Sequence, residues 1–336
     1  MTSHPGGVDV RVLVTGGAGY IGSHAVRLLE RAGHDAWVYD NLSLGHRAAV
    51  PHDRLVEGEL ADRPRVIEAL SSKGIEAVMH FAAFAAIGES VADPAKYYQN
   101  NVVASLHLLE AMRSADVKQI VFSSTTATYG IPVRVPITEE EPQRPINPYG
   151  FAKLVIERAL ADYAAAYGLA YVTLRYFNAA GASPDGDLGE DHEPETHLIP
   201  IVLQVALGQR EQITIFGDDY PTPDGTCIRD YIHVDDLGAA HVLALAHFKP
   251  GQGLQLNLGT GHGHSVREVI EACRRVTGHA IPEVVGPRRP GDPAELVADS
   301  SRAQRTMKWQ PRYPDIDSIV RTAWKWHSSH PRGYGP

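Results

Sequence analysis

Short apolar runs alternate with longer amphipathic stretches along the first half of the chain. The runs, at residues 10–14, 36–39, 77–81, 120–124 and 170–175, show little alternation between polar and apolar positions. Such runs are expected for strands that are buried on both faces of a parallel sheet. Helical patterns near residues 63–70, 94–112 and 148–167 separate them. This order predicts an α/β fold built on a doubly wound parallel sheet.

A glycine-rich turn follows the first apolar run. Gly17, Gly19 and Gly22 satisfy the spacing G-x-G-x-x-G, and Gly16 precedes them. Glycines let the backbone turn sharply and approach a pyrophosphate at the start of the next helix. Asp40 ends the second run, where a carboxylate can accept both ribose hydroxyls of NAD and would repel the 2′-phosphate of NADP. The pattern predicts a Rossmann-type unit that binds NAD; the alternative is a glycine-rich turn with an acidic cap.

The regular alternation of strands and helices fades after residue 178. A segment rich in turn-forming residues follows, and the next helix is expected at residues 199–207. We therefore predict a Rossmann-type NAD-binding domain at residues 1–178 and a smaller mixed α/β substrate-binding domain at residues 179–336. A helical pattern near residues 234–248 is expected to return to the first domain.

Tyr149 and Lys153 lie four residues apart, just inside a predicted helix. Asn147 is suited to cap that helix and Pro148 to occupy its first position. Residues four apart share a helix face. A nearby ammonium and a positively charged nicotinamide would both favour the phenolate form of a tyrosine. The pair is compatible with a tyrosine base, although the spacing alone also fits an ordinary surface pair.

Composition and charge narrow the possible partners. The chain has 336 residues, of which 43% are hydrophobic and 21% charged, as is ordinary for a globular enzyme. Its net charge of -9 argues against nucleic acid or an anionic membrane as a partner. Two cysteines, Cys227 and Cys273, cannot form a disulfide framework. The first nine residues lack the pattern of a signal peptide and are expected to form a tail, so we expect a cytoplasmic protein.

No metal site is expected from the sequence. The cysteine and histidine spacing of a zinc site is absent, and the most prominent histidine pair, His262 and His264, lies in a glycine-rich turn without a nearby acidic partner. A solvated turn is the expected structure there.

Seven sequence blocks together resemble a known family. In chain order they are TGGAGYIGSH, HFAAFAAIGES, FSSTTATYG, NPYGFAK, LRYFNAAGA, RDYIHVDD and RRPGD. They are similar to the extended short-chain dehydrogenases/reductases and, more closely, to the UDP-glucose (UDP-galactose) 4-epimerases, from about residue 10 to near the C-terminus. The resemblance implies an isomerase with a retained NAD and a UDP-sugar substrate. It also implies a homodimer, for which the helices at residues 94–112 and 148–167 offer apolar positions.

The resemblance assigns catalytic roles to three residues. Tyr149 resembles the base that takes the proton of the sugar 4-hydroxyl, and Lys153 the residue that holds the nicotinamide ribose and lowers the tyrosine pKa. Thr125 stands where the family hydrogen-bonds the 4-hydroxyl; alternatively, its hydroxyl caps its own backbone at a strand end. The implied reaction oxidises C4 transiently, turns the keto sugar over and reduces it on the opposite face.

The resemblance also assigns binding residues. Cofactor contacts fall on Gly16, Gly19, Tyr20, Ile21, Gly22, Asp40, Asn41, Glu59, Leu60, Phe81, Ala82, Ala83, Asn100, Ser123, Tyr149, Lys153 and Tyr176. Substrate contacts fall on Thr125, Tyr149, Asn178, His197, Leu198, Phe216, Arg229, Arg289, Asp292 and Leu296. For Arg229 the alternative is a surface ion pair with Asp230 or Asp235.

Several positions depart from the family pattern and leave the substrate open. Ala85 replaces a lysine that reaches the cofactor, Glu59 replaces an aspartate, and His197 replaces an asparagine. Leu296 has an intermediate size at a position that helps decide whether an N-acetyl group fits. The alternatives are therefore 4-epimerases of UDP-GlcNAc/GalNAc, UDP-xylose/arabinose or UDP-uronates.

Three other functions remain possible. An NDP-sugar dehydratase needs an acid and a base after the strand-end threonine, whereas Thr126 and Ala127 follow Thr125 here. A net oxidoreductase would consume external NAD(P)H, and a nucleotide-sensing regulator usually lacks the tyrosine–lysine pair.

Overall fold

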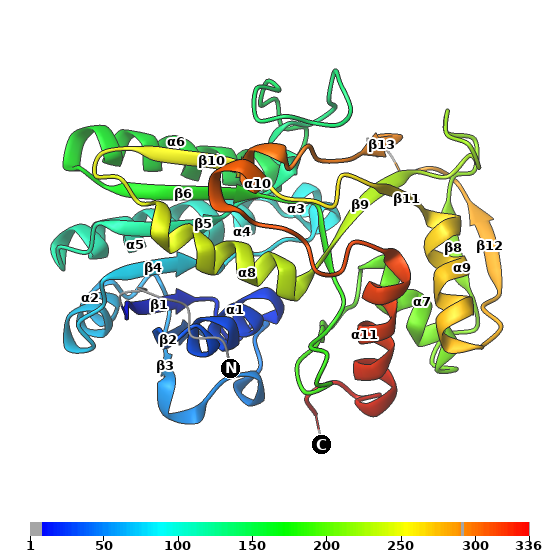
Figure 1. Ribbon diagram of the computed structural model, residues 1–336, viewed down its shortest axis with the longest axis horizontal. Coiled ribbons are helices and arrows are strands. Elements are labelled where there is room, and N and C mark those ends of the chain that lie inside the picture. The colour runs from blue at the N-terminus through cyan, green and yellow to red at the C-terminus, as the bar shows by residue number, and fades with distance from the viewer. Residues whose placement is uncertain (1–8, 290–291, 336) are drawn as a thin grey trace.

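A parallel sheet of seven strands forms the larger part of the computed structural model, which describes residues 9–289 and 292–335. The strand order is β3-β2-β1-β4-β5-β6-β10, and every neighbouring pair is parallel (Figure 1). The strands are β1 (Arg11–Thr15), β2 (Asp35–Asp40), β3 (Leu55–Glu57), β4 (Ala77–His80), β5 (Gln119–Ser123), β6 (Ala170–Arg175) and β10 (Gly253–Asn257). This confirms the predicted doubly wound α/β fold. The tail predicted at the N-terminus falls largely on residues 1–8, outside the described residues.

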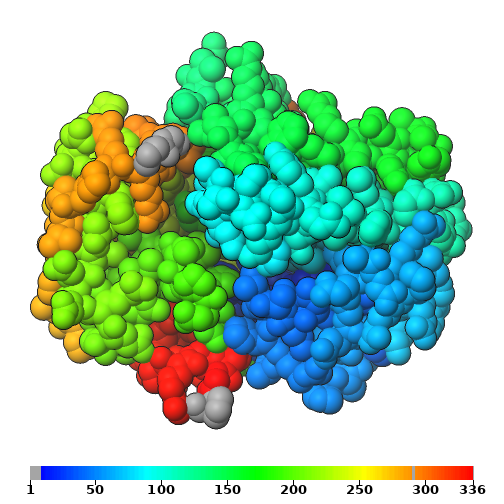
Figure 2. All heavy atoms as spheres, turned by 180° about the vertical axis from the view of Figure 1, so that it is seen from behind, coloured from blue at the N-terminus to red at the C-terminus, as the bar shows by residue number. Residues whose placement is uncertain are grey.

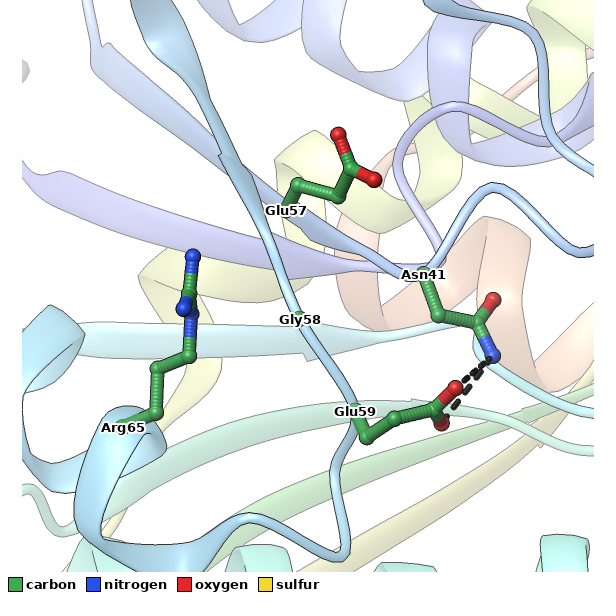
Figure 3. Close-up of a pocket in the computed structure, with 5 residues that line it drawn as sticks. All are labelled: Asn41, Glu57, Gly58, Glu59 and Arg65. Carbon is green, nitrogen blue, oxygen red and sulfur yellow. Dashed lines mark hydrogen bonds between the residues drawn. The ribbon is translucent and has the colours of Figure 1, made fainter.

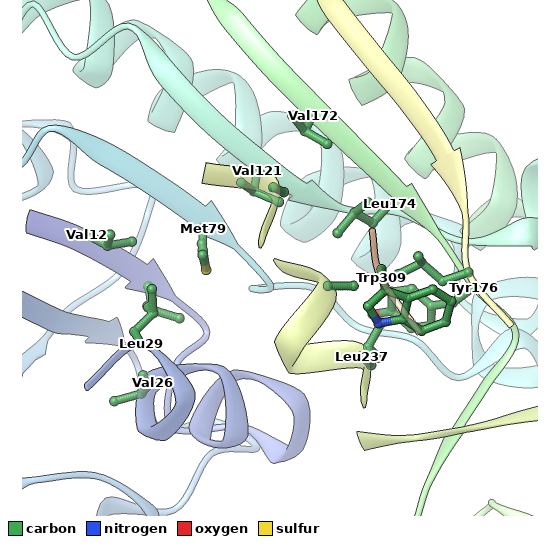
Figure 4. Close-up of a cluster of buried hydrophobic side chains, with 14 of the residues drawn as sticks. Val12, Val26, Leu29, Met79, Val121, Val172, Leu174, Tyr176, Leu237 and Trp309 are labelled. Atoms are coloured by element: carbon green, nitrogen blue, oxygen red, sulfur yellow. The ribbon is translucent and has the colours of Figure 1, made fainter. Parts of the chain in front are cut away.

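Helices cover both faces of this sheet. The helices α1 (Tyr20–Arg31) and α8 (Val234–Ala244) pack on one face, and α2 (Arg63–Ser72), α5 (Ala104–Ser114) and α6 (Pro148–Tyr167) on the other. Successive strand residues point to opposite faces, so Val12 and Val14 join the first core cluster and Leu13 the second. Figure 4 shows the first cluster, in which Val26 and Leu29 of α1 and Leu237 of α8 pack beneath the strands.

A smaller group of elements lies beside the large sheet. Strand β9 (Ile228–His233) pairs with β7 (Asn178–Ala180), β11 (Gly263–Ser265) and β13 (Glu295–Leu296), while β8 (Ile213–Phe216) pairs with β12 (Glu283–Gly286). The helices α7 (Leu198–Ala206), α9 (Val266–Thr277) and α11 (Ile316–Ser329) share a third core cluster with β7, β8 and β9. Figure 2 shows the two groups from behind, with the surface hollowed between the cyan segment and the yellow-green and orange segments.

The chain returns to the large sheet more extensively than the sequence predicts. The expected helix is α8, which continues into a short 3₁₀ turn (Leu245–His247). In addition, β10 forms the edge of the large sheet, and the indole of Trp309, after α10 (Ser301–Met307), is buried in the first core cluster. Both additions come from weakly patterned segments.

The helix predicted at residues 94–112 is divided. It consists of α4 (Pro94–Tyr97), a π-helical stretch (Tyr98–Val103) and α5. The buried Asn101 lies in this stretch and binds both backbone groups of Phe84, with Asn101 Oδ1 accepting from the amide at 2.9 Å and Nδ2 donating to the carbonyl at 2.9 Å. The π-helical stretch thus contains the residue that holds the loop after β4 by two hydrogen bonds.

The remaining short elements are α3 (Ile87–Ala92) and the 3₁₀ turns Arg47–Ala49, His52–Arg54 and Thr126–Thr128. Among the helices of the described residues, we find none with both the length and the apolar character needed to cross a membrane.

Candidate active site

The predicted site residues gather at the carboxyl edge of the large sheet. Strands β1 and β4 are neighbours although the chain forms β2 and β3 between them, so the strand order reverses there. Ligands of such sheets bind in the crevice at this reversal. The loop after β1 and the loop after β4 touch: a Cβ added to Gly16 would lie 2.5 Å from the amide nitrogen of Ala82.

The glycines of the first loop have different roles. Gly16 has a φ of +72°, and a Cβ on Gly22 would lie 2.2 Å from the carbonyl oxygen of Gly16, so both positions are closed by the protein's own backbone. A Cβ on Gly19 would meet its nearest neighbour, the same oxygen, at 3.4 Å. Gly19 is the N-cap of α1, which has no side-chain cap within the described part of the chain and no acidic residue in its first turn. The uncapped first turn of α1 and the space beside Gly19 therefore fit a pyrophosphate.

Two further predicted residues flank the start of α1. Tyr20 donates its hydroxyl to the carbonyl oxygen of Gly181 at 2.7 Å, which ties the glycine loop to the segment after β7. Ile21 packs against the first core cluster and so holds α1 on the sheet.

Asp40 ends β2 and is almost fully buried. One carboxylate oxygen accepts the amide of Ala18 at 2.9 Å and the other accepts the amide of Leu42 at 2.8 Å. Burial raises the pKa of Asp40, although these backbone donors oppose the shift. The carboxylate is thus fixed beside the glycine loop, and each oxygen keeps lone-pair capacity for a ribose hydroxyl.

A cavity of about 360 Å³ lies beyond Asp40, at the ends of β2 and β3 (Figure 3). Its lining consists of Asn41, Glu57, Gly58, Glu59 and Arg65. The Asn41 amide nitrogen lies 3.1 Å from each carboxylate oxygen of Glu59. Leu60, the next predicted residue, is buried. This cavity could hold the adenosine end of a dinucleotide.

The helix start predicted at Asn147 is confirmed. The Asn147 side-chain oxygen accepts the amide of Gly150 at 2.8 Å, and Pro148 is the first residue of α6. Lys153 is buried, and its ammonium donates to the carbonyl oxygen of Ser123 at 2.8 Å. The Asn147 cap thus fixes where α6 begins. Lys153, in the next turn, is thereby placed so that its ammonium reaches the end of β5.

Burial adds an effect on Tyr149 and Lys153 that the sequence does not reveal. Burial of its hydroxyl end raises the pKa of Tyr149 to about 12, and a hydrogen bond with Thr125 opposes this only in part. Burial also lowers the pKa of Lys153 to about 7, against the attraction of Glu157. In the protein alone, the pKa of Tyr149 therefore moves in the direction opposite to the one expected from Lys153, because burial outweighs charge.

Thr125 has the capping role that was considered as the alternative for it. Its hydroxyl oxygen accepts the amide of Ala127 at 3.1 Å. The same hydroxyl faces Tyr149 and lowers the pKa of that phenol against the larger effect of burial. The residues that follow, Thr126 and Ala127, carry no carboxylate. The strand end thus presents hydroxyl groups rather than an acid.

The other predicted cofactor residues surround the ends of β4, β5 and β6. The hydroxyls of Ser123 and Tyr176 lie 2.6 Å apart. Phe81 and Tyr176 both contact His241 of α8, at ring centroid distances of 4.6 and 6.3 Å. Ala83 lies in the loop after β4, and Asn100 donates to Asn101 Oδ1 at 2.9 Å.

Glu157 is a supporting residue that sequence reasoning missed. It is buried one turn beyond Lys153 and accepts hydrogen bonds from Ser124 at 2.5 Å, Gln143 at 2.8 Å and Arg175 at 2.6 and 3.0 Å. The network joins α6 to the ends of β5 and β6. The helical spacing Tyr149–Lys153–Glu157 is the signal that could have revealed it.

The predicted substrate residues lie in the smaller group of elements. The Arg229 guanidinium pairs with the Asp292 carboxylate, and Leu296 is the neighbour of Arg229 in the pairing of β13 with β9. The guanidinium carbon of Arg289 lies 4.1 Å from the ring centroid of Phe216, whose side chain is 38% exposed.

The alternative ion pairs considered for Arg229 do not form. Asp230 accepts the amides of Thr260 and Gly261 at 2.9 and 3.1 Å, and Asp235 bonds His24 at 2.6 Å. The partner is Asp292, which is distant in sequence.

Asn178, His197 and Leu198 complete the predicted set. Asn178 begins β7 and donates to the carbonyl oxygen of Asp230 at 3.2 Å. Leu198 is the first residue of α7, and the Nδ1 atom of the preceding His197 lies against Glu190 and Glu195.

The model of the NAD-dependent epimerase/dehydratase family matches residues 12–259. The chain belongs to this family. Membership in the NAD-dependent epimerase/dehydratase family confirms the NAD cofactor predicted from the glycine loop and Asp40.

Individual relatives are similar over almost the whole chain. A UDP-glucose 4-epimerase of Halalkalibacterium halodurans is 56% identical over 324 residues, which cover 96% of this chain and 97% of that relative. The structure of a UDP-glucose 4-epimerase from Brucella ovis in complex with NAD has a TM-score of 0.91 at 52% identity, covering 94% of this chain and 97% of that one. One from Bifidobacterium longum in complex with NAD+ and UDP has a TM-score of 0.92 at 40% identity, covering 97% and 100%.

Proposed function

We propose that the protein is an isomerase, an NAD-dependent UDP-sugar 4-epimerase that interconverts UDP-galactose and UDP-glucose. One observation carries the proposal: Tyr149, which faces Thr125, and Lys153, which binds the carbonyl oxygen of Ser123, lie at the end of β5, on the sheet edge that also bears the glycine loop. The relatives named UDP-glucose 4-epimerase, at up to 56% identity, support the same reaction.

The residues of the site suggest how the proton is handled. Bound NAD supplies a reversible two-electron acceptor for C4 of the sugar. Tyr149 takes the proton of the 4-hydroxyl and returns it after the sugar has turned over, and the Thr125 hydroxyl, which faces Tyr149, orients the two oxygen atoms. Because burial raises the pKa of Tyr149, the phenolate needs a positive neighbour. Lys153 can supply that charge once the anionic pyrophosphate has favoured its protonated form.

The elements of the smaller group supply groups that could hold a UDP moiety. Arg229 and Arg289 are suited to the diphosphate because a guanidinium donates several charge-assisted hydrogen bonds. Arg229 is presently paired with Asp292, so substrate phosphate would exchange for that carboxylate. The half-exposed ring of Phe216, beneath Arg289, offers a face for the uracil.

The strand end argues against a dehydratase. Elimination of water needs a proton donor and acceptor beside the tyrosine. The two positions after Thr125 hold Thr126 and Ala127, neither of which carries a carboxyl group that could act as the acid or the base. Epimerisation needs no such second pair, because the tyrosine that takes the proton also returns it.

The proposed activity is tested without added cofactor. Purified protein is incubated with UDP-galactose alone, and UDP-glucose is sought by NMR. Formation of UDP-glucose supports both the isomerisation and the retention of NAD. No turnover in protein shown to contain NAD would refute the proposed activity, and turnover only when NAD is supplied would refute retention.

The substrate range is open at Leu296, which neighbours Arg229 in the sheet pairing. We propose UDP-hexoses as the main substrates. Parallel incubations with UDP-N-acetylgalactosamine, UDP-xylose and UDP-galacturonate define the range. A faster reaction with any of them than with UDP-galactose would reassign the preference.

We also propose that the protein is a cytoplasmic homodimer. Its two cysteines are free and buried, as expected in a reducing compartment. Near the start of α6, Phe151 and Tyr98 are 47% and 38% exposed and meet edge to face at 6.3 Å, and the nearby α3 exposes Ile87 and Val91. This apolar patch supports pairing through these helices. Phe151→Glu should shift the mass measured by light scattering from dimer to monomer, whereas an unchanged dimer would place the interface elsewhere.

We propose that the boundary between a cofactor-binding domain and a substrate-binding domain lies at residue 178. The first comprises residues 1–178 with α8, and the segments β10 and α10 also pack on it. The second comprises the rest of residues 179–336.

A further inference from the structure

Four side chains that could ligate a metal converge in the segment before α7. They are Glu190, His192, Glu195 and His197, and their ligand atoms all lie within 4.8 Å of one another. The two carboxylates are buried, with 3% and 4% of their side chains exposed, whereas the imidazoles reach the surface. The carboxylates thus form the buried part of the cluster, and solvent reaches it from the side of the imidazoles.

The spacing of the atoms is that of ligands around one ion. His197 Nδ1 lies 2.8 Å from Glu190 Oε1 and 3.1 Å from Glu195 Oε1. His192 Nδ1 lies 3.2 Å from Glu190 Oε1 and 3.8 Å from Glu195 Oε2. Two ligands bound tetrahedrally to zinc at ordinary bond lengths are separated by about 3.3 Å. The observed distances scatter around this value.

Two of these atoms are buried without hydrogen bonds. Glu190 Oε1 and His192 Nδ1 are enclosed, yet neither has a hydrogen-bond partner anywhere in residues 9–289 and 292–335. They lie close together but are not aligned as donor and acceptor. Leaving buried polar atoms without partners is costly. The arrangement is expected if the lone pairs of both atoms point at one bound ion, which would satisfy them.

The surroundings hold the ligands in place. Glu195 Oε1 accepts the amides of Thr196 and His197 at 2.7 and 2.8 Å. The carbonyl oxygen of Glu190 accepts the indole N–H of Trp326 at 3.1 Å. Such outer contacts orient the ligands of metal sites.

We propose that Glu190, His192, Glu195 and His197 form a binding site for one divalent transition-metal ion, zinc in the first instance. Two neutral imidazoles and two carboxylates balance a 2+ charge and suit zinc, whereas magnesium and calcium require more oxygen ligands. The site is structural: it fixes the segment that leads into α7 and so positions Leu198. It is distinct from His262 and His264, and it departs from the expectation that the chain has no metal site.

The competing state is a metal-free cluster of ion pairs. Burial favours the neutral imidazoles, but the neighbouring carboxylates outweigh it: they raise the pKa of His192 to about 9 and that of His197 well above its usual value. Two imidazolium–carboxylate pairs would therefore also neutralise the cluster. The two states differ in whether the cluster binds a cation stoichiometrically.

Cobalt(II) is the probe that separates them. Tag-free, NAD-containing protein is treated with a chelator, dialysed and titrated with CoCl₂. We expect one equivalent to bind with the intense visible absorption of a tetrahedral nitrogen–oxygen site, to be displaced by Zn²⁺ and to persist in excess Mg²⁺. Zn²⁺ should also raise the Tm. Absence of stoichiometric uptake, or only the weak absorption of hydrated cobalt, overturns the proposal.

Variants assign the site to these residues. His192→Gln, and independently Glu195→Gln in case the first variant folds poorly, should abolish the cobalt absorption while circular dichroism and bound NAD stay unchanged. The double variant His262→Gln/His264→Gln removes an equal number of imidazoles elsewhere and should keep the absorption. Retention of the signal in both cluster variants, or its loss in the control, overturns the assignment. Because the readouts are a spectrum and a melting temperature, the outcome is independent of the proposed epimerase activity.

Discussion

Burial disfavours charge on both side chains that carry the proposed chemistry. It raises the pKa of Tyr149 to about 12 and lowers that of Lys153 to about 7. The spacing of the two residues is visible in the sequence, but their burial is not. A prediction from spacing alone therefore finds the pair but omits the effect of burial, which opposes the phenolate until a positive charge is bound nearby.

Tyr149→Phe isolates the phenolic oxygen. The ring is retained, so bound NAD and the fold should be unchanged, while kcat should fall by about 10²–10⁴-fold, as is typical when a general base is lost. NMR turnover assays and the NAD content of the purified variant measure both effects. Activity close to that of the unchanged protein would show that another group takes the proton.

Gly19→Ala tests the open position in the glycine loop. A Cβ there meets nothing in the protein closer than 3.4 Å, so the fold should persist with a loss below about 1 kcal/mol for the changed N-cap. The methyl group would instead occupy pyrophosphate space, and bound NAD should be lost. Acid release of NAD and the thermal melt are the measurements.

Gly22→Ala is the matched control, because its Cβ would lie 2.2 Å from the Gly16 carbonyl oxygen and should lower the Tm sharply. Normal NAD content in Gly19→Ala would contradict the placement of the pyrophosphate.

At the scale of elements, Glu157 joins α6 to the strand ends that carry the site. Glu157→Gln leaves the buried Arg175 without its counter-charge and should cost about 3–5 kcal/mol of unfolding free energy, measured by urea denaturation. The double variant Glu157→Leu/Arg175→Met removes both charges and should lose less than Glu157→Gln alone. Equal losses in the two proteins would show that the pair does not act as a unit.

Most strands and helices of the first half could be predicted because each buries a continuous apolar run or stripe. The exceptions are β3, which has no fully buried residue, and α3, which buries only Ser90. The π-helical stretch could not be predicted, since it accompanies the bonds between Asn101 and Phe84, which lie in different elements. Strand β10 was missed because it lies at the edge of the sheet and exposes part of its length. The pairing of Arg229 with Asp292 depends on the tertiary structure and leaves no local pattern.

At the scale of the whole molecule, three buried histidines make stability depend on pH. Burial lowers the pKa of His80 to about 3 and those of His233 and His241 to about 4. An unfolded histidine titrates near 6.5, so below that pH the unfolded chain binds more protons than the folded protein. The contribution of these three histidines to stability should be complete above pH 6.5 and fall toward pH 4, by up to about 1.4 kcal/mol per pH unit for each histidine.

His241→Leu should reduce the slope of the unfolding free energy against pH by the amount that corresponds to about one proton. Its Nε2 atom is buried and has no hydrogen-bond partner among the described residues, so leucine should be tolerated at pH 8. Urea denaturation between pH 8 and pH 4.5 gives the slopes for both proteins. Parallel curves would mean that His241 titrates alike in the folded and unfolded states.

The most direct measurement of the central claim follows one hydrogen atom. UDP-galactose deuterated at C4 is incubated with the protein in unlabelled water without added NAD, and the product is analysed by NMR and mass spectrometry. If a retained cofactor takes the atom from C4 and returns it to the opposite face, UDP-glucose should form with deuterium still at C4. Release of deuterium to water, accumulation of an oxidised or dehydrated sugar, or dependence on added NAD would contradict the account.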